Sequence, residues 1–262
     1  MENNLKQFER LLIIMDDLRE KCPWDKKQTL ESLRHLTIEE TYELCDAIIE
    51  NDLDELKGEI GDLILHMVFY SKIASEKKAF DIGDVLEFVC DKLVYRHPHV
   101  YGDVKADTEE AVKTNWEKIK LDEKQDSAGF KSVLKGVPNS MPSLVKAIRI
   151  QDKVQAVGFD WDNKDQVWEK VKEELDEFKV ESGKNDQTKM EEEFGDLMFS
   201  LVNYARFIGV NPDDALERTN KKFIKRFTEM EKSVHSEGQD LQSMNLRQMN
   251  VHWERAKKKK KI

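Results

Sequence analysis

Apolar residues recur along most of the chain at the three- and four-residue spacing typical of amphipathic helices. Leu11, Leu12, Met15 and Leu18 form one apolar stripe, and a second contains Ile38, Tyr42, Cys45 and Ile49. No segment shows the alternating pattern of a half-buried strand. We therefore predict an all-α protein in which these stripes, with Cys45, face the interior.

A series of acidic and aromatic motifs occurs twice along the chain. Glu39-Glu40-Thr41-Tyr42-Glu43 aligns with Glu173-Glu174-Leu175-Asp176-Glu177 at an offset of 134 residues. Sixteen residues later, at the same offset, Glu59-Ile60-Gly61-Asp62 aligns with Glu193-Phe194-Gly195-Asp196. An ordered series of this kind indicates an internal repeat rather than chance acidity.

Weaker matches extend the repeat on both sides of these motifs. Upstream, Trp24-Asp25 resembles Trp161-Asp162, and downstream Lys92/Arg96 and Trp116 correspond to Lys222/Arg226 and Trp253. The sequence thus predicts tandem helical modules over residues 1–125 and 142–262, joined by a linker at 126–141 that is rich in turn-forming residues. Neither module is long enough to bury all its apolar faces, so we expect modules to pack on each other, within a chain or between chains.

The second acidic helix of each module combines carboxylates with apolar residues around most of its circumference. In the first module the apolar set is Ile60, Leu63, Ile64, Leu65, Met67, Val68 and Phe69. A helix that is apolar nearly all round is expected to be buried. Buried carboxylates are costly unless a cation or a donor compensates them.

Pairs of carboxylates three residues apart lie on one helix face. Two antiparallel helices would therefore gather four carboxylates in each module. The predicted sets are Glu40, Glu43, Glu59 and Asp62 in the first module, and Glu174, Glu177, Glu193 and Asp196 in the second. Clustered like charges need compensation, and hard divalent cations prefer oxygen ligands. We predict Mg²⁺, with Mn²⁺ as a possible substitute.

Two alternatives to a magnesium site remain open. The carboxylates could form a solvated acidic face, or the helices could form a di-iron carboxylate bundle. The latter normally requires a Glu-x-x-His pair on each of two helices, whereas Asp62 and Asp196 occupy that position here. His66 lies one turn further along and can be interpreted as a core histidine or as a ligand.

Basic residues distinguish the two modules. Lys170, Lys172 and Lys189 align with Leu36, Ile38 and Glu55 of the first module. Cations beside a metal site suit a polyphosphate, although each lysine alone could be an ordinary solvated residue. As a group they favour the second module as the phosphate site. Trp116 and Trp253 could each stack on a nucleobase or pack in a core.

Composition narrows the possible partners and compartments. The net charge is −10, which argues against nucleic acid as a partner. No apolar stretch is long enough for a membrane span. Three cysteines without a CxxC motif indicate a reduced, cytoplasmic protein, and Cys90 is expected, like Cys45, to be a small core residue.

The motif EExxE, sixteen residues and then ExxD resembles the metal-binding signature of the MazG family of nucleoside triphosphate pyrophosphohydrolases. The resemblance extends from about Leu5 to Trp253 and includes four further segments: Cys22-Pro23-Trp24-Asp25, Arg96-His97-Pro98-His99-Val100, Gly158-Phe159-Asp160-Trp161 and Lys222-Phe223-Ile224-Lys225-Arg226. It implies tandem all-α modules in an intertwined homodimer. It also implies Mg²⁺-dependent cleavage of NTPs and dNTPs between the α- and β-phosphates, giving NMP and pyrophosphate, for control or cleaning of the nucleotide pool.

The resemblance also implies roles for individual positions. The eight carboxylates named above would be the metal ligands. The implied substrate contacts are Lys170, Val171, Lys172, Glu173, Glu174, Lys189, Met190, Glu191, Glu192, Lys222, Phe223, Arg226 and Trp253. In the mechanism we expect, a water that is metal-bound or oriented by Glu173 or Glu192 attacks phosphorus, while Lys189 and Arg226 offset charge on the leaving pyrophosphate. A non-catalytic nucleotide-sensing or interaction module is the alternative, above all for the first half.

Overall fold

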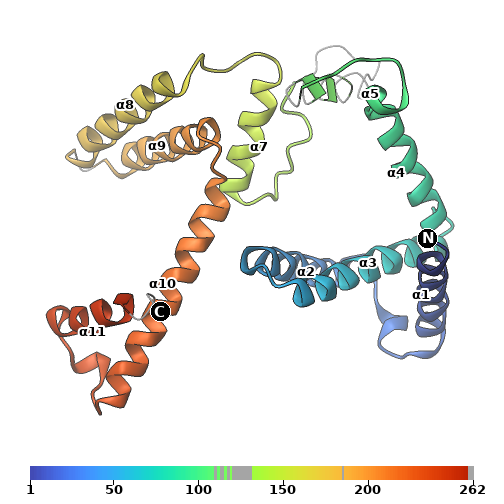
Figure 1. The fold of residues 1–262 in the computed structure, drawn as a ribbon, viewed down its shortest axis with the longest axis horizontal. Helices are drawn as coiled ribbons and strands as arrows, with labels where there is room; N and C mark the ends of the chain where they lie inside the picture. The colour runs from blue at the N-terminus through green and yellow to red at the C-terminus, as the bar shows by residue number, and fades with distance from the viewer. Residues whose placement is uncertain (109–110, 113–114, 117–118, 120–131, 185, 259–262) are drawn as a thin grey trace. The chain divides into compact units, whose positions relative to one another are not determined.

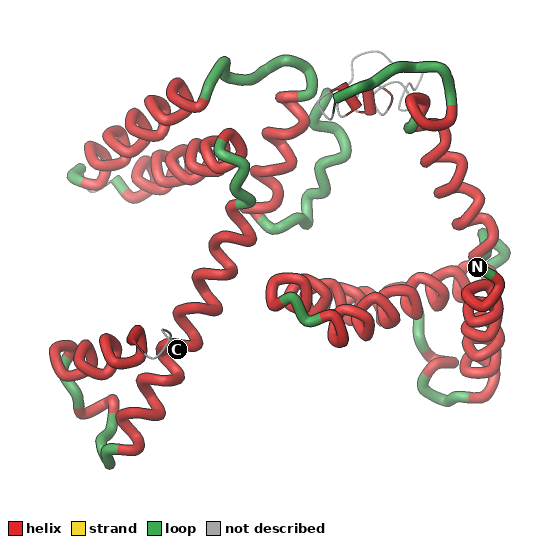
Figure 2. The backbone as a smooth tube through the Cα atoms, in the orientation of Figure 1, coloured by secondary structure: helices red, strands yellow, loops and turns green. Residues whose placement is uncertain are grey.

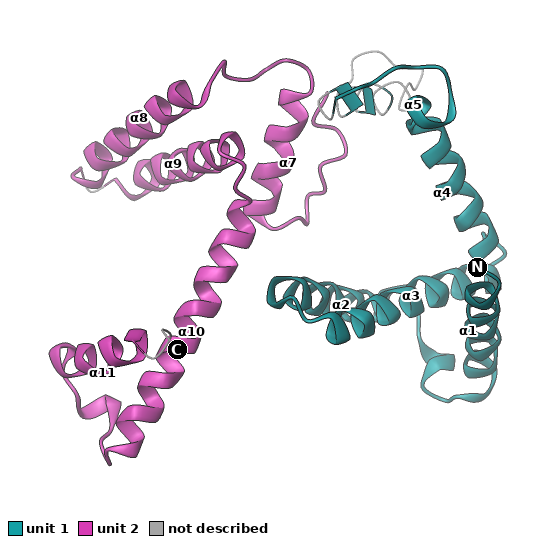
Figure 3. Ribbon diagram, viewed as in Figure 1, with its two compact units in different colours: residues 1–123 teal, residues 124–262 magenta. Residues whose placement is uncertain are grey.

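The computed structural model describes the chain except for residues 109–110, 113–114, 117–118, 120–131, 185 and 259–262. Contacts divide it into two compact units, Met1–Glu123 and Lys124–Ile262 (Figure 3). Residues 126–131 of the predicted linker lie outside the described part, so its bounds stay a prediction. All regular structure in the described residues is helical (Figure 2), which confirms the predicted fold class.

The first unit is built around a long helical hairpin, α2 (Leu30–Glu50) and α3 (Leu53–Glu76) (Figure 1). Helix α1 (Glu2–Lys21) packs on α3 and leads through a 3₁₀ turn, η1 (Asp25–Lys27), to α2. Helices α4 (Ile82–Arg96) and α5 (Pro98–Tyr101) follow.

The hairpin turn is encoded by two adjacent residues. Asn51 ends α2 with a left-handed backbone (φ 56°), and the Asp52 side chain accepts hydrogen bonds from the amides of Asp54 and Glu55 to begin α3. Asparagine tolerates that backbone conformation, and aspartate is a favoured helix cap. At its other end α2 starts with a reciprocal capping box between Thr29 and Ser32.

The second unit repeats the hairpin with α8 (Lys164–Ser182) and α9 (Gln187–Phe207). Asn163 caps α8, and Asp186 caps α9. Helix α7 (Ser143–Gln155) packs against α9. Helix α10 (Pro212–Ser236) extends from the α7–α9 end, and after a 3₁₀ turn, η2 (Leu241–Ser243), helix α11 (Leu246–Lys258) folds back on α10 (Figure 1).

The core of the first unit confirms the α1 stripe. Met15, Leu33, Val68, Phe69 and Ile73 form a buried cluster, and Leu11 and Leu12 pack against it. Met15 and Leu33 are each only 1% exposed. Apolar positions of α1, α2 and α3 thus account for the centre of this unit.

Three burial predictions are wrong for the single chain. On α2, Ile38, Tyr42 and Cys45 are exposed, and on α3, Ile60, Ile64 and Met67 are 42–46% exposed. Cys90 on α4 is also exposed. The physical reason is that α2 packs mainly on α3. The side of α2 that α3 covers is the side with Leu33 and Ala47, not the side with Tyr42. The opposite apolar face is left uncovered within the unit.

We predict that Leu33→Ala lowers the free energy of unfolding of the first unit by about 2–5 kcal/mol, because it leaves a cavity in a well-packed core. Leu5→Ala is the matched control: Leu5 is 66% exposed, and its truncation should change stability by less than about 0.5 kcal/mol. Urea unfolding of both variants measures the difference. Equal stability of the two variants would contradict this packing.

Candidate functional site

Each hairpin brings together carboxylates from its two helices. Ligand oxygens of Glu40, Glu43 and Glu59 lie within 4.8 Å of one another, and the same holds for Glu174, Glu177 and Glu193. The geometry follows from the short turn, which holds each helix pair antiparallel. Six of the eight predicted ligands are therefore grouped as expected. Asp62 and Asp196 fall outside these tight groups but lie close enough to act electrostatically on them.

The clustering changes the ionisation of the carboxylates. Burial and the charges of Asp62 and Glu43 raise the pKa of Glu40 to about 7. Burial, followed by the charges of Glu177 and Asp196, raises the pKa of Glu193 above its ordinary value. Both clusters therefore resist full ionisation when no cation compensates them.

The donor set suits a hard divalent cation. Both clusters consist of carboxylates alone, and in the first of them Glu59 Oε2 is buried without a hydrogen-bond partner. An unsatisfied buried carboxylate oxygen is costly unless a ligand supplies the missing partner. His66 is 7% exposed and belongs to neither cluster, and burial lowers its pKa. Among the described residues the donor chemistry therefore favours Mg²⁺ or Mn²⁺ over iron.

Lys170 gives the second cluster a cation of its own. Its Nζ lies 2.6 Å from Glu174 and 2.9 Å from Glu173, and hydrogen bonds to these two carboxylates raise its pKa. The corresponding residue of the first module, Leu36, packs against the hydrophobic core. Only the second module thus places an ammonium group beside its carboxylates at this position.

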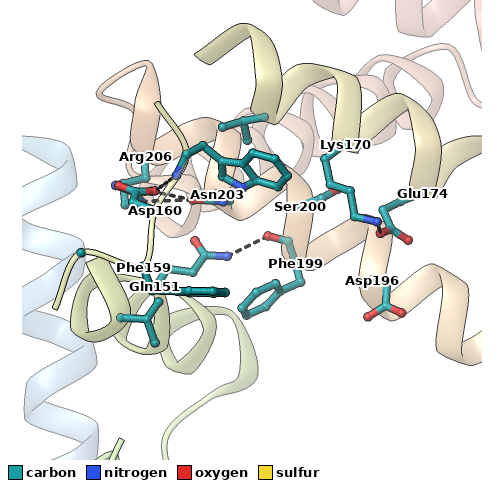
Figure 4. Close-up of a pocket in the computed structure, with 14 residues that line it drawn as sticks. Gln151, Phe159, Asp160, Lys170, Glu174, Asp196, Phe199, Ser200, Asn203 and Arg206 are labelled. Carbon is teal, nitrogen blue, oxygen red and sulfur yellow. Dashed lines mark hydrogen bonds and ion pairs between the residues drawn. The ribbon is translucent and has the colours of Figure 1, made fainter. Parts of the chain in front are cut away.

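A pocket of about 560 Å³ opens beside the second cluster. Figure 4 shows Lys170, Glu174 and Asp196 on one side of it and Asp160, Asn203 and Arg206 on the other. Its walls come from α7, α8, α9 and the loop after α7, which provides Gly158–Trp161. The volume is in the range of small-molecule sites.

The side of the pocket away from the carboxylates is organised by an ion pair. Both terminal nitrogens of Arg206 donate to the Asp160 carboxylate, and Arg206 Nε and Nη2 also donate to Asn203 Oδ1 at 3.2 and 2.9 Å. Gln151 donates from Nε2 to the Phe199 carbonyl oxygen at 2.8 Å. The sequence did not single out these side chains. Their one signal was the segment Gly158-Phe159-Asp160-Trp161, in which Gly158 adopts a φ of 84° to redirect the chain.

The structure separates the predicted substrate contacts into two groups. On α8 and α9, Lys170 and Glu174 line the pocket, whereas Val171 is buried and Lys172 is turned to Glu169 at 2.7 Å. Lys189 and Glu192 are exposed near the start of α9, with Met190 half-buried and Glu191 bonded to Gln187. Glu173 is held by Lys170.

The other group lies on α10 and α11. Phe223 and Trp253 are in ring contact, with centroids 5.2 Å apart, and Phe223 also stacks on Phe227. Lys222 is exposed beside them, and the buried Nε of Arg226 has no hydrogen-bond partner. Helix α11 packs on α10 (Figure 1), and none of these α10 and α11 residues lines the pocket beside the carboxylates.

Comparisons with known proteins match both hairpins to one family. The MazG nucleotide pyrophosphohydrolase domain matches residues 28–101 and 163–230, which include the two hairpins. The chain is 42% identical over 259 residues to a nucleoside triphosphate pyrophosphohydrolase of Escherichia coli (strain K12), covering 97% of this chain and 98% of that protein. It is 44% identical over 253 residues to the nucleoside triphosphate pyrophosphohydrolase/pyrophosphatase MazG of Thermotoga maritima, covering 95% of each.

Among solved structures, a crystal structure of a MazG-related protein from Thermotoga maritima is 33% identical and covers 43% of this chain and 98% of its own, with a TM-score of 0.39. No described helix is both long and apolar enough to span a bilayer.

We predict that Glu40→Gln raises the melting temperature of the metal-free protein at pH 8 by several degrees and changes it little at pH 4.5. The pKa of Glu40 rises from 4.5 to about 7 on folding, so the folded state favours the protonated form. The free energy of unfolding therefore falls as the pH rises from 4.5 to about 7, because Glu40 becomes charged in a site that disfavours the charge. The uncharged amide of the Glu40→Gln variant would not lose this stability. Thermal unfolding in EDTA measures the effect.

The exposed neighbour Glu39 provides the control. Glu39→Gln should leave the pH dependence of the melting temperature unchanged. If Glu39→Gln and Glu40→Gln behave alike, the carboxylate cluster does not control this titration.

Proposed function

The chain belongs to the MazG family of nucleotide pyrophosphohydrolases, and we propose that it hydrolyses NTPs and dNTPs between the α- and β-phosphates in a Mg²⁺-dependent reaction. The products are a nucleoside monophosphate and pyrophosphate. One observation carries the proposal: in the second module a carboxylate cluster, a lysine and a nucleotide-sized pocket adjoin each other.

The second cluster fits a divalent cation by its chemistry. Glu174, Glu177, Glu193 and Asp196 would hold Mg²⁺, and the raised pKa of Glu193 is a sign of charge that such an ion would relieve. When bound, the ion supplies a Lewis acid that polarises a phosphoryl oxygen.

The chain's own side chains bind and orient the reactants. Lys170 places a positive charge at the pocket edge, where it can pair with a phosphate oxygen. Glu173 or Glu192 orients the attacking water toward phosphorus and accepts a proton from that water. Lys189 and Arg226 offset the charge that develops on the pyrophosphate leaving group.

The two modules divide this work unequally. The first module has a similar carboxylate cluster, but it has Leu36 in place of Lys170 and Phe69 in place of Asn203. Both Leu36 and Phe69 belong to, or pack against, the hydrophobic core. The first module therefore suits cation binding and an interaction or sensing role better than hydrolysis.

A homodimer would complete the molecule. The apolar face of α2 and α3 is uncovered within the first unit, and the aromatic group on α10 and α11 does not line the pocket of its own chain. Packing of a second copy would bury the former and could bring Lys222, Arg226 and Trp253 to the site. Light scattering on the purified chain should give twice its mass of 30.7 kDa.

We predict that Glu193→Ala lowers kcat for dNTP hydrolysis by at least about a hundredfold, because it removes a carboxylate from the centre of the cluster. Glu59→Ala, at the corresponding position of the first module, should retain most of the activity. Pyrophosphate release from dATP with Mg²⁺ measures both. Full activity in Glu193→Ala, or release of single orthophosphate by the wild type, would refute the proposed reaction.

We predict that Lys170→Met raises KM for dATP by about tenfold or more, since an ion pair to phosphate is lost. Lys179→Met is the matched control: Lys179 lies on the same helix, is exposed and pairs with Asp176 at 2.8 Å. Steady-state kinetics of the two variants under equal Mg²⁺ separates the roles. An equal effect of both substitutions would show that Lys170 contributes only general surface charge.

A further inference from the structure

Gln151 presents an unused hydrogen-bond acceptor in the pocket. Its side chain is 3% exposed, its Nε2 donates to the Phe199 carbonyl oxygen, and its Oε1 is buried without a partner (Figure 4). The bond to Phe199 fixes which end of the amide is the acceptor. A buried amide oxygen left unsatisfied costs free energy that a ligand donor can recover.

Asn203 presents the opposite polarity. Its Oδ1 accepts two hydrogen bonds from Arg206, and Arg206 is itself held by Asp160. The amide nitrogen Nδ2 therefore remains as the donor of this side chain. The pocket thus carries an oriented acceptor on α7 and an oriented donor on α9.

The polar pair and the carboxylates lie in different parts of one pocket. Figure 4 shows Lys170, Glu174 and Asp196 well apart from Asp160, Asn203 and Arg206, with Phe199 between them. A nucleotide whose phosphates meet the carboxylate end would direct its base to the amide end. Phe159 and Trp161, 79% and 43% exposed, also line the pocket and offer aromatic surface to a base.

The first module lacks this arrangement. At the position of Asn203 it has Phe69, which is 3% exposed in the core, and at the position of Phe199 it has Leu65, which packs against the same core. An apolar core side chain thus takes the position of the Asn203 amide. That amide is therefore a feature of the second repeat rather than a requirement of the hairpin fold.

We propose that Gln151 and Asn203 bind the hydrogen-bonding edge of the nucleobase, with Gln151 Oε1 accepting from an N–H of the base and Asn203 Nδ2 donating to a neighbouring ring nitrogen or carbonyl oxygen. This inference rests on the proposed function, because it assumes that a nucleoside triphosphate occupies the pocket. Gln151 is then a specificity-determining residue.

This pair of amides distinguishes bases that carry a hydrogen-bond donor on the recognised edge from bases that lack one, and it does not distinguish one standard base from another. Adenine and cytosine offer an exocyclic amine beside a ring nitrogen, and guanine, thymine and uracil offer a ring N–H beside a carbonyl oxygen. All standard bases can therefore satisfy both amides. The site selects against bases that lack a donor on this edge, and it is compatible with broad use of standard nucleotides.

The test compares dATP with the triphosphate of 2′-deoxyribosylpurine, which lacks the 6-amino group and adds no bulk. The wild type should prefer dATP in kcat/KM by about tenfold or more, because the analogue leaves Gln151 Oε1 unpaired. Gln151→Met replaces the amide with an apolar side chain of similar length, and its ratio should fall to near one. Gln155→Met, at an exposed position of the same helix, should keep the wild-type ratio.

The outcomes separate this inference from the proposed function. A wild-type ratio near one overturns it without any variant, and so does an unchanged ratio in Gln151→Met. If Gln151→Met loses activity on both substrates, the wild-type ratio decides. If the wild type releases no pyrophosphate from either substrate, the proposed function itself fails.

Discussion

The central physical constraint on this protein is the repulsion among carboxylates that two antiparallel helices hold close together. Glu174, Glu177 and Glu193 have oxygens within 4.8 Å of one another, because the antiparallel α8–α9 pair places them on facing sides. The hairpin is held by helix caps at Asn163 and Asp186 and by the packing of α7 on α9. A divalent cation relieves this repulsion, so the energetic cost of the cluster in the free protein becomes binding energy for the ion.

A few residue changes give the same hairpin different surroundings in the two modules. Leu36 and Phe69 contribute to the core of the first module, whereas Lys170 and Asn203 leave a charged and polar pocket in the second. In the first module the two apolar side chains add buried apolar area, whereas in the second module the corresponding polar side chains contribute less buried apolar area and line a pocket instead. These differences underlie our proposal that hydrolysis takes place in the second module.

The helices, the repeat and the grouping of carboxylates could be predicted because they depend on local spacing. Glu40 and Glu43 share a face by helix geometry alone, and Glu59 follows after one short turn. The pairing of Asp160 with Arg206 and of Gln151 with Phe199 could not be predicted, since it joins segments 46 and 48 residues apart. Helical periodicity also could not tell the α2 stripe at Tyr42 from a core stripe, because an apolar helix face that is exposed within its unit carries the same pattern as a buried one.

The central claim is that the carboxylates of the second module hold the catalytic cation. The most direct test is a crystal structure of the full chain with Mn²⁺ and a non-hydrolysable nucleotide, recorded at the manganese absorption edge. The account predicts an anomalous peak among Glu174, Glu177, Glu193 and Asp196, in contact with the phosphates. A nucleotide bound with its phosphates elsewhere, and no manganese between these four carboxylates, would contradict it.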